Sequence, residues 1–198
     1  MQKEKQRNPA EFPVLGMLYT RPAHGYDLCR KLRQQLGEIW TLRTSHIYAL
    51  LAGLERDGLV RHNCVEQGTR PAKKVFTITD KGRLVFWVWV RSPVMNVRDI
   101  RLEFLTKLHF ARLDSFSTLE DLIANQLNVC RSGRRRLKKV RVLSETETEA
   151  VGLDFRVAML SAAIRWLERL LPSEVREDAG RMLKEFPGGD KHAFMGDR

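Results

Sequence analysis

Apolar side chains recur at helical spacing three times near the start of the chain. In the third case, four apolar residues repeat at i, i+3, i+4 and i+7, which is the pattern of a helix with one buried face. These residues are Ile47, Leu50, Leu51 and Leu54. Two weaker patterns predict helices over 9–19 and 24–36, and Gly37 supplies an end signal for the second of them. Between these two helices, residues 21–25 contain proline and glycine and predict a turn.

The pattern then changes to short β-branched runs. Residues 59–62 and 74–78 predict two strands, and the segment 66–74, which contains glycine and proline, predicts the loop of a hairpin. Another helix, rich in aromatic residues, is expected to begin at 79–82. Three short helices followed by a two-stranded hairpin is the order of a winged helix-turn-helix.

The second half of the chain is helical in pattern. Amphipathic spacing predicts helices over 97–111, 116–144 and 147–171, then a shorter helix to Phe186 and a mobile tail. Apolar stripes run along the two long helices. Their members are Leu119, Ile123, Cys130, Leu137 and Val140, then Val151, Phe155, Ala158, Ala162, Trp166 and Leu170. Stripes of this length favour burial against a second chain.

The composition changes at residues 91–93. Before this point helical patterns alternate with β-branched runs, and after it almost every pattern is helical. The sequence therefore predicts a mainly α fold with a small β-hairpin wing. We expect a winged helix-turn-helix DNA-binding domain over 1–93 and a helical C-terminal dimerisation domain over 94–198.

Positive charge is concentrated in two regions of a chain whose net charge is +11. Residues 1–93 carry 16 Lys/Arg against 8 Asp/Glu, and the run 131–141 holds seven basic residues and no acid. Such regions favour a polyanionic partner, nucleic acid or an anionic membrane surface, over charge that only aids solubility. The run itself has two interpretations. In the first, its face is solvated or paired with acids across a dimer. In the second, the face contacts flanking DNA. The residues on that face are Arg131, Arg134, Arg135 and Lys138.

Several protein classes are disfavoured. Cys29, Cys64 and Cys130 are widely spaced, which argues for reduced thiols and a cytoplasmic location rather than for a disulfide framework. The N-terminal residues lack a secretory signal, and no apolar run approaches the roughly 20 residues that span a bilayer. Histidines are scattered, and neither zinc-ligand spacing nor a nucleophile motif, phosphate loop or carboxylate pair is present. The sequence thus predicts no membrane partner, no metal, no cofactor and no enzyme.

The N-terminal end of the third predicted helix presents small polar and basic side chains on the face opposite its apolar stripe. The DNA major groove admits one helix, and such side chains can approach base edges there. Free N–H groups at the helix start attract phosphate, and basic residues at the hairpin suit a wing that follows the DNA backbone. The residues predicted on these grounds to contact double-stranded DNA are Arg43, Thr44, Ser45, His46, Ala49, Arg70, Lys73 and Lys74.

From Val14 to Gly82 the chain resembles the PadR-like transcriptional regulators. The matching stretches are VLGMLY, HGYDL, the Trp and Leu of WTL, HIYALLAGLERDGLV and GTRPAKKVFTITDKG. The resemblance implies a homodimeric, sequence-specific regulator, more often a repressor, whose two third helices enter successive major grooves about 34–36 Å apart. It also places Tyr48 on a family tyrosine that contacts the DNA backbone. The helical second half resembles the virulence-activator-type C-terminal domain of larger members.

The chain departs from the family pattern at several positions. Arg43 stands where a capping serine is frequent, and Thr44-Ser45 replace a usual Pro-Gly pair. Phe76 replaces a frequent tyrosine, and Gly53 stands where a long basic residue is common. Because a glycine inside a helix costs about 1 kcal/mol relative to alanine, we expect close packing at that glycine. These departures bear on the operator sequence more than on the fold.

Some interpretations remain open. Phe86, Trp87 and Trp89 either pack the connecting helix or line a site for a small aromatic effector, as aromatic residues near there do in family members. His24 and Tyr26 are expected to fix the turn and the core rather than to bind metal. The alternative function, from a different class, is a helical interaction or scaffold protein whose winged helix contacts another protein.

Overall fold

The structure is a computed structural model that describes residues 7–67 and 70–171, without the side chains of residues 66, 67 and 70–72. The predicted helix up to residue 186 and the predicted tail lie outside the described residues. The chain divides into two compact units, Met1–Asn125 and Gln126–Arg198. No described helix is long and apolar enough to cross a membrane.

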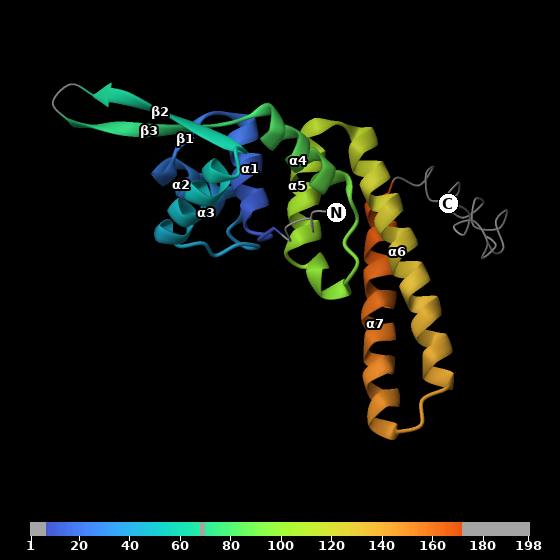
Figure 1. Ribbon diagram of the computed structural model, residues 1–198. Helices are drawn as coiled ribbons and strands as arrows, with labels where there is room; N and C mark the ends of the chain where they lie inside the picture. Colours follow the sequence, from blue (N-terminus) through green and yellow to red (C-terminus); the bar gives the residue numbers. More distant parts are fainter. Residues whose placement is uncertain (1–6, 68–69, 172–198) are drawn as a thin grey trace, which may run out of the picture. The chain divides into compact units, whose positions relative to one another are not determined.

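The first unit contains the predicted winged helix-turn-helix, two further helical segments and the start of α6 (Phe116–Val142) (Figure 1). Its helices are α1 (Glu11–Thr20), α2 (Gly25–Leu36), α3 (Thr44–Arg56), α4 (Asp80–Arg91), the 3-10 helix η1 (Val97–Ile100) and α5 (Glu103–Asp114). Its strands are β1 (Ala23–His24), β2 (Val60–Gln67) and β3 (Arg70–Ile78). The β2–β3 hairpin projects from the helices as the wing, which confirms the expected fold class.

The sheet is antiparallel, with the strand order β1-β3-β2. Val60 pairs with Ile78 at the base of the hairpin, and the register shifts between Val65 and Gln67. The prediction of a simple turn over 21–25 was wrong, since β1 lies inside this segment and pairs with β3. A strand of two residues is too short to show the alternation by which strands are recognised in a sequence.

The apolar stripe of α3 forms part of the core, as its spacing predicts. Ile47, Leu50, Leu51 and Leu54 are all buried. The close packing expected at Gly53 was wrong, because no heavy atom lies within 4 Å of the position that its Cβ would occupy. The helix ends at Asp57, and the next residue, Gly58, has a φ of 71°, a left-handed conformation that favours glycine.

One long helix was expected over 97–111, and the chain instead forms η1 and α5 with a break at Arg101 and Leu102.

A buried ion pair then fixes α5. The Nζ of Lys107, a residue 1% exposed, lies 2.8 Å from Glu103 Oε1 and donates to the Ser92 carbonyl at the end of α4, also at 2.8 Å. Burial lowers the pKa of the Lys107 amine, and Glu103 opposes that shift. Trp89 Nε1 donates to the same glutamate at 3.0 Å.

His109, also on α5, is expected to make the fold sensitive to acid. Its Nε2 is buried without a hydrogen-bond partner among the described residues, and burial, together with Arg112, lowers the pKa of its imidazole. The unfolded chain takes up a proton at the ordinary histidine pKa of about 6.5, before the folded protein does. Stability is therefore lost as the pH falls from about 6.5 through the lowered pKa. Thermal unfolding from pH 7.5 to 5 should show a smaller loss of Tm in His109→Gln, and an unchanged loss would contradict this role.

The two long helices α6 (Phe116–Val142) and α7 (Glu147–Leu170) run antiparallel beside each other, and α6 begins in the first unit (Figure 1). Arg131 pairs with Glu168 at 2.7 Å, and Arg141 pairs with Asp154, so both ends of the basic run meet acids of the same chain. The inward residues of α7 are Leu153, Leu160, Ile164 and Leu167. Most of the apolar stripe predicted along α7 does not face α6. Its members Val151, Phe155, Ala158 and Ala162 are exposed in the single chain.

The predicted domain boundary at 93/94 falls between α4 and η1, whereas the compact units meet inside α6. Helices η1 and α5 belong to the same unit as the winged helix. The assignment of DNA binding and dimerisation to two separate domains stays a prediction.

Candidate nucleic-acid interface

Helix α3 presents a continuous exposed face opposite its buried stripe. The predicted residues at its N-terminal end are all exposed. They are Arg43, Thr44, Ser45, His46, Tyr48 and Ala49. The same face continues through Ala52 and Arg56, which are also exposed and which the sequence reasoning left out. They could have been found from the helical period, because they lie seven and eleven residues after Ser45.

The first turn of α3 leaves its backbone N–H groups uncapped by side chains. Arg43 is the N-cap residue, with an extended backbone, and no side chain makes a capping hydrogen bond there. Thr44 Oγ1 lies 3.5 Å from the Sγ of Cys29 on α2, so its hydroxyl also contacts the neighbouring helix. Ser45 and His46 are the exposed polar side chains that follow. An uncapped helix start with exposed polar groups favours contact with an anion.

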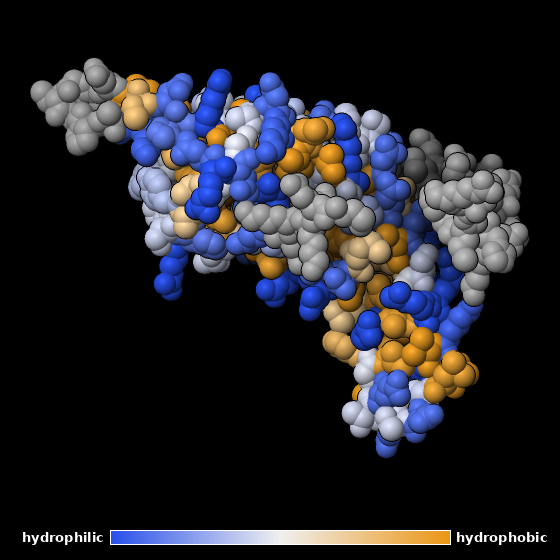
Figure 2. Space-filling model, viewed as in Figure 1, coloured by the Kyte–Doolittle hydropathy of each residue, from blue (hydrophilic) through white to orange (hydrophobic). Residues whose placement is uncertain are grey.

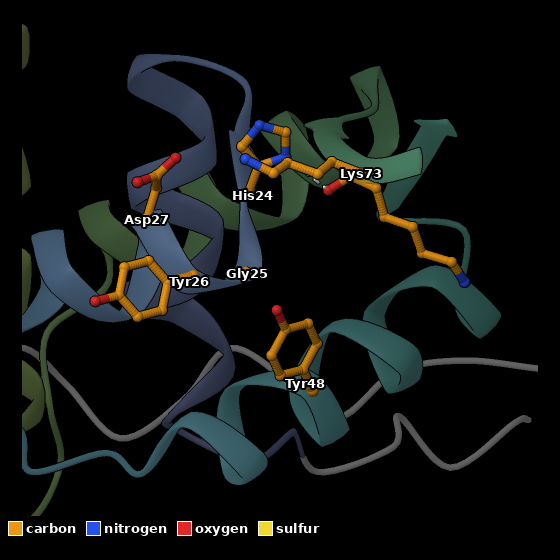
Figure 3. A pocket seen from close by; sticks show the side chains of 7 residues that line it. His24, Gly25, Tyr26, Asp27, Tyr48 and Lys73 are labelled. Atoms are coloured by element: carbon orange, nitrogen blue, oxygen red, sulfur yellow. Dashed lines mark hydrogen bonds between the residues drawn. The ribbon is translucent and has the colours of Figure 1, made fainter. Parts of the chain in front are cut away.

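A cavity of about 410 Å³ opens beside this face, where the start of α2, the outer side of α3 and strand β3 meet (Figure 3). Its lining residues are His24, Gly25, Tyr26, Asp27, Tyr48, Lys73 and Lys74. The hydroxyl of Tyr48 points into the opening below His24 and Lys73, whereas the Tyr26 ring points away from Tyr48. Three of the predicted DNA contacts, Tyr48, Lys73 and Lys74, are thereby brought together.

His24 fixes the wing to the start of α2. Its Nδ1 lies 3.1 Å from the Lys74 carbonyl oxygen, and because a carbonyl only accepts, the Nδ1 nitrogen is the one that donates. His24 also pairs with Val75 through β1. The expectation that His24 fixes the turn is consistent with this contact, but Tyr26 is 68% exposed and does not pack in the core.

Tyr48 lies directly on the backbone of α2 at Gly25. A Cβ at Gly25 would be 2.5 Å from Tyr48 Cε1 and 2.7 Å from Cζ, closer than real Cβ contacts come. Glycine at this place in the HGYDL motif therefore leaves room for the tyrosine ring. The sequence alone does not reveal this pairing, since the two residues belong to different helices.

Gly25→Ala is expected to push the Tyr48 ring out of the cavity without unfolding the protein, because Tyr48 is 48% exposed and can turn toward solvent. If Tyr48 contacts DNA, affinity should fall by about tenfold, the effect of one lost hydrogen bond to a charged group. Fluorescence anisotropy with labelled duplex would measure this loss, and Tyr48→Ala should show a similar one. Additive losses in the double variant would mean that the glycine acts by another route.

The charge around the cavity is mainly positive. Lys73 and Lys74 are exposed, and the one lining carboxylate, Asp27, lies 3.3 Å from the guanidinium of Arg30. Arg70 begins β3, but its side chain is not among those described. A tyrosine hydroxyl, two ammonium groups and the start of a helix can together hold a phosphate oxygen.

The base of the wing is tied to the end of α3 by a contact that the sequence reasoning did not predict. His62 on β2 places Nδ1 at 2.5 Å from Glu55 Oε1 on α3, and its ring lies 5.6 Å from that of Phe76 on β3. The wing is therefore held at two places, by His24 against the start of α2 and by His62 against the end of α3.

The aromatic residues predicted at an effector site separate into two groups. Phe86 and Trp87 line a second cavity, of about 250 Å³, between α1, α4 and α5. The other lining residues are Tyr19, Thr20, Phe110 and Leu113. Trp89 is not among them, because it stacks on Phe12 with 4.3 Å between ring centroids and donates to Glu103. In the described part of the chain, no group of three or more His, Cys, Asp or Glu side chains could hold a metal ion.

Comparisons with known proteins agree on one family. The family model described as the transcriptional regulator PadR-like family matches residues 14–86. The chain is 29% identical over 117 residues to the negative transcriptional regulator PadR of Bacillus subtilis, covering 59% of the chain and 64% of the relative. It is 34% identical over 93 residues to a probable transcriptional regulator of Mycobacterium tuberculosis, covering 47% and 49%. These matches span less than two thirds of either relative.

Solved structures of related proteins are also similar. The B. subtilis PadR structure in complex with operator DNA is 23% identical, with 82% of this chain and 97% of that chain covered and a TM-score of 0.44. A PadR-like transcriptional regulator from Bacillus cereus is 27% identical, with 89% and 99% covered and a TM-score of 0.40. The virulence-activator-type resemblance of the second half stays a prediction. Residues 14–86 therefore form a PadR-like segment, of the kind that defines this family of transcriptional regulators.

Proposed function

We propose that the protein is a transcriptional regulator that binds specific sequences in double-stranded DNA. The observation that carries this proposal is the exposed face of α3 beside the cavity that contains Tyr48 and Lys73. The small polar side chains of Ser45 and His46 can reach base edges in the major groove, while the cavity holds a backbone phosphate. The B. subtilis relative was solved with operator DNA, which supports the same partner here.

The sign of regulation is proposed from the relatives. The B. subtilis protein is named a negative transcriptional regulator, and this favours repression. A protein with this partner acts in the compartment that holds the DNA, for which the sequence favours the cytoplasm. The proposal includes no catalytic step and no cofactor.

The protein is also proposed to act as a homodimer. Several large apolar side chains of α6 and α7 are exposed, and Figure 2 shows hydrophobic residues gathered near the connection between the two helices. They are Val140 and Val142 on α6, Leu143 in the connection, and Val151 and Phe155 on α7. A contiguous apolar surface of this kind favours a partner, and a second copy supplies the symmetry that a two-site operator requires. Sedimentation should detect a dimer at micromolar concentration, and a wild-type monomer would contradict this part.

The cavity lined by Phe86 and Trp87 is proposed as the place for a small, flat aromatic effector. Its walls are aromatic or apolar apart from Thr20, and its volume of about 250 Å³ suits a single ring system better than a large ligand. Titration with planar aromatic compounds should change the protein fluorescence of the wild type until the change saturates. The Phe110→Ala variant should not reach saturation at the same concentration. Equal responses in both proteins would place binding elsewhere.

The experiment that tests the main proposal is the salt dependence of DNA retention. Binding through phosphates releases counterions, so the logarithm of affinity should fall with the logarithm of salt concentration by about 0.9 per contact. An interaction or scaffold protein, the alternative function, would retain no duplex selectively at low salt. Absence of sequence-selective retention at about 50 mM salt would contradict the proposal.

A further inference from the structure

The loop that leads into α3 is anchored by a residue from α5. Between the end of α2 at Leu36 and the start of α3 at Thr44, the side chain of Trp40 donates from Nε1 to Thr106 Oγ1 at 2.7 Å. The two residues are 66 positions apart in the sequence and lie in the same compact unit. The loop before α3, the helix proposed to read DNA, is thus held by a residue outside the helix-turn-helix.

Thr106 is suited to accept this hydrogen bond. Its side chain is fully buried, and its hydroxyl donates to the Leu102 carbonyl at 2.6 Å, which leaves an oxygen lone pair for the indole N–H of Trp40. The Leu102 carbonyl also accepts from the backbone N–H of Thr106. Replacing the threonine hydroxyl with a methyl group would therefore leave the indole N–H, rather than this carbonyl, without its partner.

The next residue on α5 fixes the helix that carries Thr106. Lys107 binds the Ser92 carbonyl at the end of α4 and pairs with Glu103, and its Nζ lies 4.8 Å from the centroid of the Trp89 ring. This buried cluster holds α5 against α4 at the position adjacent to Thr106. Trp40 is consequently anchored to a helix that is itself fixed.

Trp40 is held at its backbone as well, because its N–H donates to the Leu36 carbonyl at 2.7 Å. Residues 41–43 separate it from α3, and three residues reach about 10 Å when fully extended. The Arg43 carbonyl then accepts from the Ile47 N–H at 3.1 Å and closes the first turn of α3. A displaced Trp40 would therefore shift the turn that carries the proposed reading residues.

We infer that Trp40 and Thr106 are positioning residues for DNA recognition: their hydrogen bond sets the first turn of α3 in the place where it distinguishes base sequences. The inference rests on the proposed function of α3. Loss of the hydrogen bond lowers affinity for the preferred sequence and leaves the proposed phosphate contact of Lys73 in place, since Lys73 lies on β3 and not on α3.

The test uses the full chain, Trp40→Phe, Thr106→Val, the double variant and the rescue variant Thr106→Ser. Two duplexes of about 30 base pairs serve as probes, one with the motif that the wild type enriches from a random pool and one with that motif scrambled. Both single variants should lose about tenfold in affinity for the motif duplex and clearly less for the scrambled one. The double variant should lose no more than a single one, and Thr106→Ser should bind as the wild type does.

Hydrogen exchange of the free protein gives a readout that needs no DNA. The amide of Ile47, which closes the first turn of α3, should exchange several-fold faster in Thr106→Val and Trp40→Phe than in the wild type or Thr106→Ser. Unchanged exchange at Ile47 would overturn the inference, as would equal losses of affinity for both duplexes. A wild type that does not distinguish the two duplexes would instead refute the proposed function, and exchange would then decide the anchor alone.

Discussion

Gly82→Ala is expected to destabilise the protein by about 2–3 kcal/mol, within the range of an overpacked core. A Cβ at this position would lie 2.1 Å from the Leu59 carbonyl oxygen, an atom of the backbone. That carbonyl accepts from the backbone N–H of Thr79 at 3.0 Å and shares the Thr79 hydroxyl hydrogen with the Gly58 carbonyl. The same hydroxyl accepts from the Gly82 N–H at 3.1 Å. Because these bonds hold both sides of the contact, neither side can move away at low cost. Urea unfolding measures the effect.

Gly53→Ala is the matched control for this prediction. It is the same substitution in another helix, and the new Cβ meets no heavy atom within 4 Å. The alanine should stabilise α3 by up to about 1 kcal/mol, the helix-propensity difference between the two residues. If both variants lose stability to a similar extent, the contact between Gly82 and Leu59 is not what makes glycine necessary at the start of α4.

Removal of both wing lysines is expected to have the largest effect on DNA binding. The double variant Lys73→Ala, Lys74→Ala should lose affinity for all duplexes about equally. The slope of the logarithm of its affinity against the logarithm of salt concentration should become shallower by about one unit for each lost phosphate contact. The reason is that lysine acts as a point charge on the backbone, while the bases are read from α3. Affinity measured from about 50 to 200 mM salt on two unrelated sequences checks both statements.

Lys138 and Lys139 on α6 provide the control for the charge change itself. Both are exposed, and their replacement by alanine removes the same two charges far from the wing in sequence. The salt dependence of DNA binding should then stay as in the wild type. A similar loss of slope in both double variants would mean that the basic run of 131–141 also contacts DNA, which is the second interpretation of that run.

The core of the reading helix was predictable from the sequence, whereas the cavity beside it was not. Ile47, Leu50, Leu51 and Leu54 follow the helical period, which is a local property of the chain. The cavity depends on the contact between Tyr48 and Gly25, and the anchor of α3 depends on one between residues 66 positions apart. Contacts of this kind leave no periodic signal in a single sequence.

The predictions that were wrong have separate physical reasons. The break between η1 and α5 is not marked by glycine or proline, and hydrophobic spacing continues across it. Tyr26 was expected to help fix the turn and the core, but its place on α2 directs it to solvent. Gly53 was judged by its cost to the helix alone, and the structure contains no neighbour that needs the space.

Selection of bound fragments from a random DNA pool tests the central proposal most directly, if wild type and the double variant Ser45→Ala, His46→Ala are compared. The wild type should enrich a pseudo-palindrome whose half-sites are about 10–10.5 base pairs apart, as two reading helices of a dimer require. The variant should enrich a motif that differs at positions within each half-site. Failure to enrich any motif, or enrichment of one motif by both proteins, would contradict the proposal that the exposed face of α3 reads DNA.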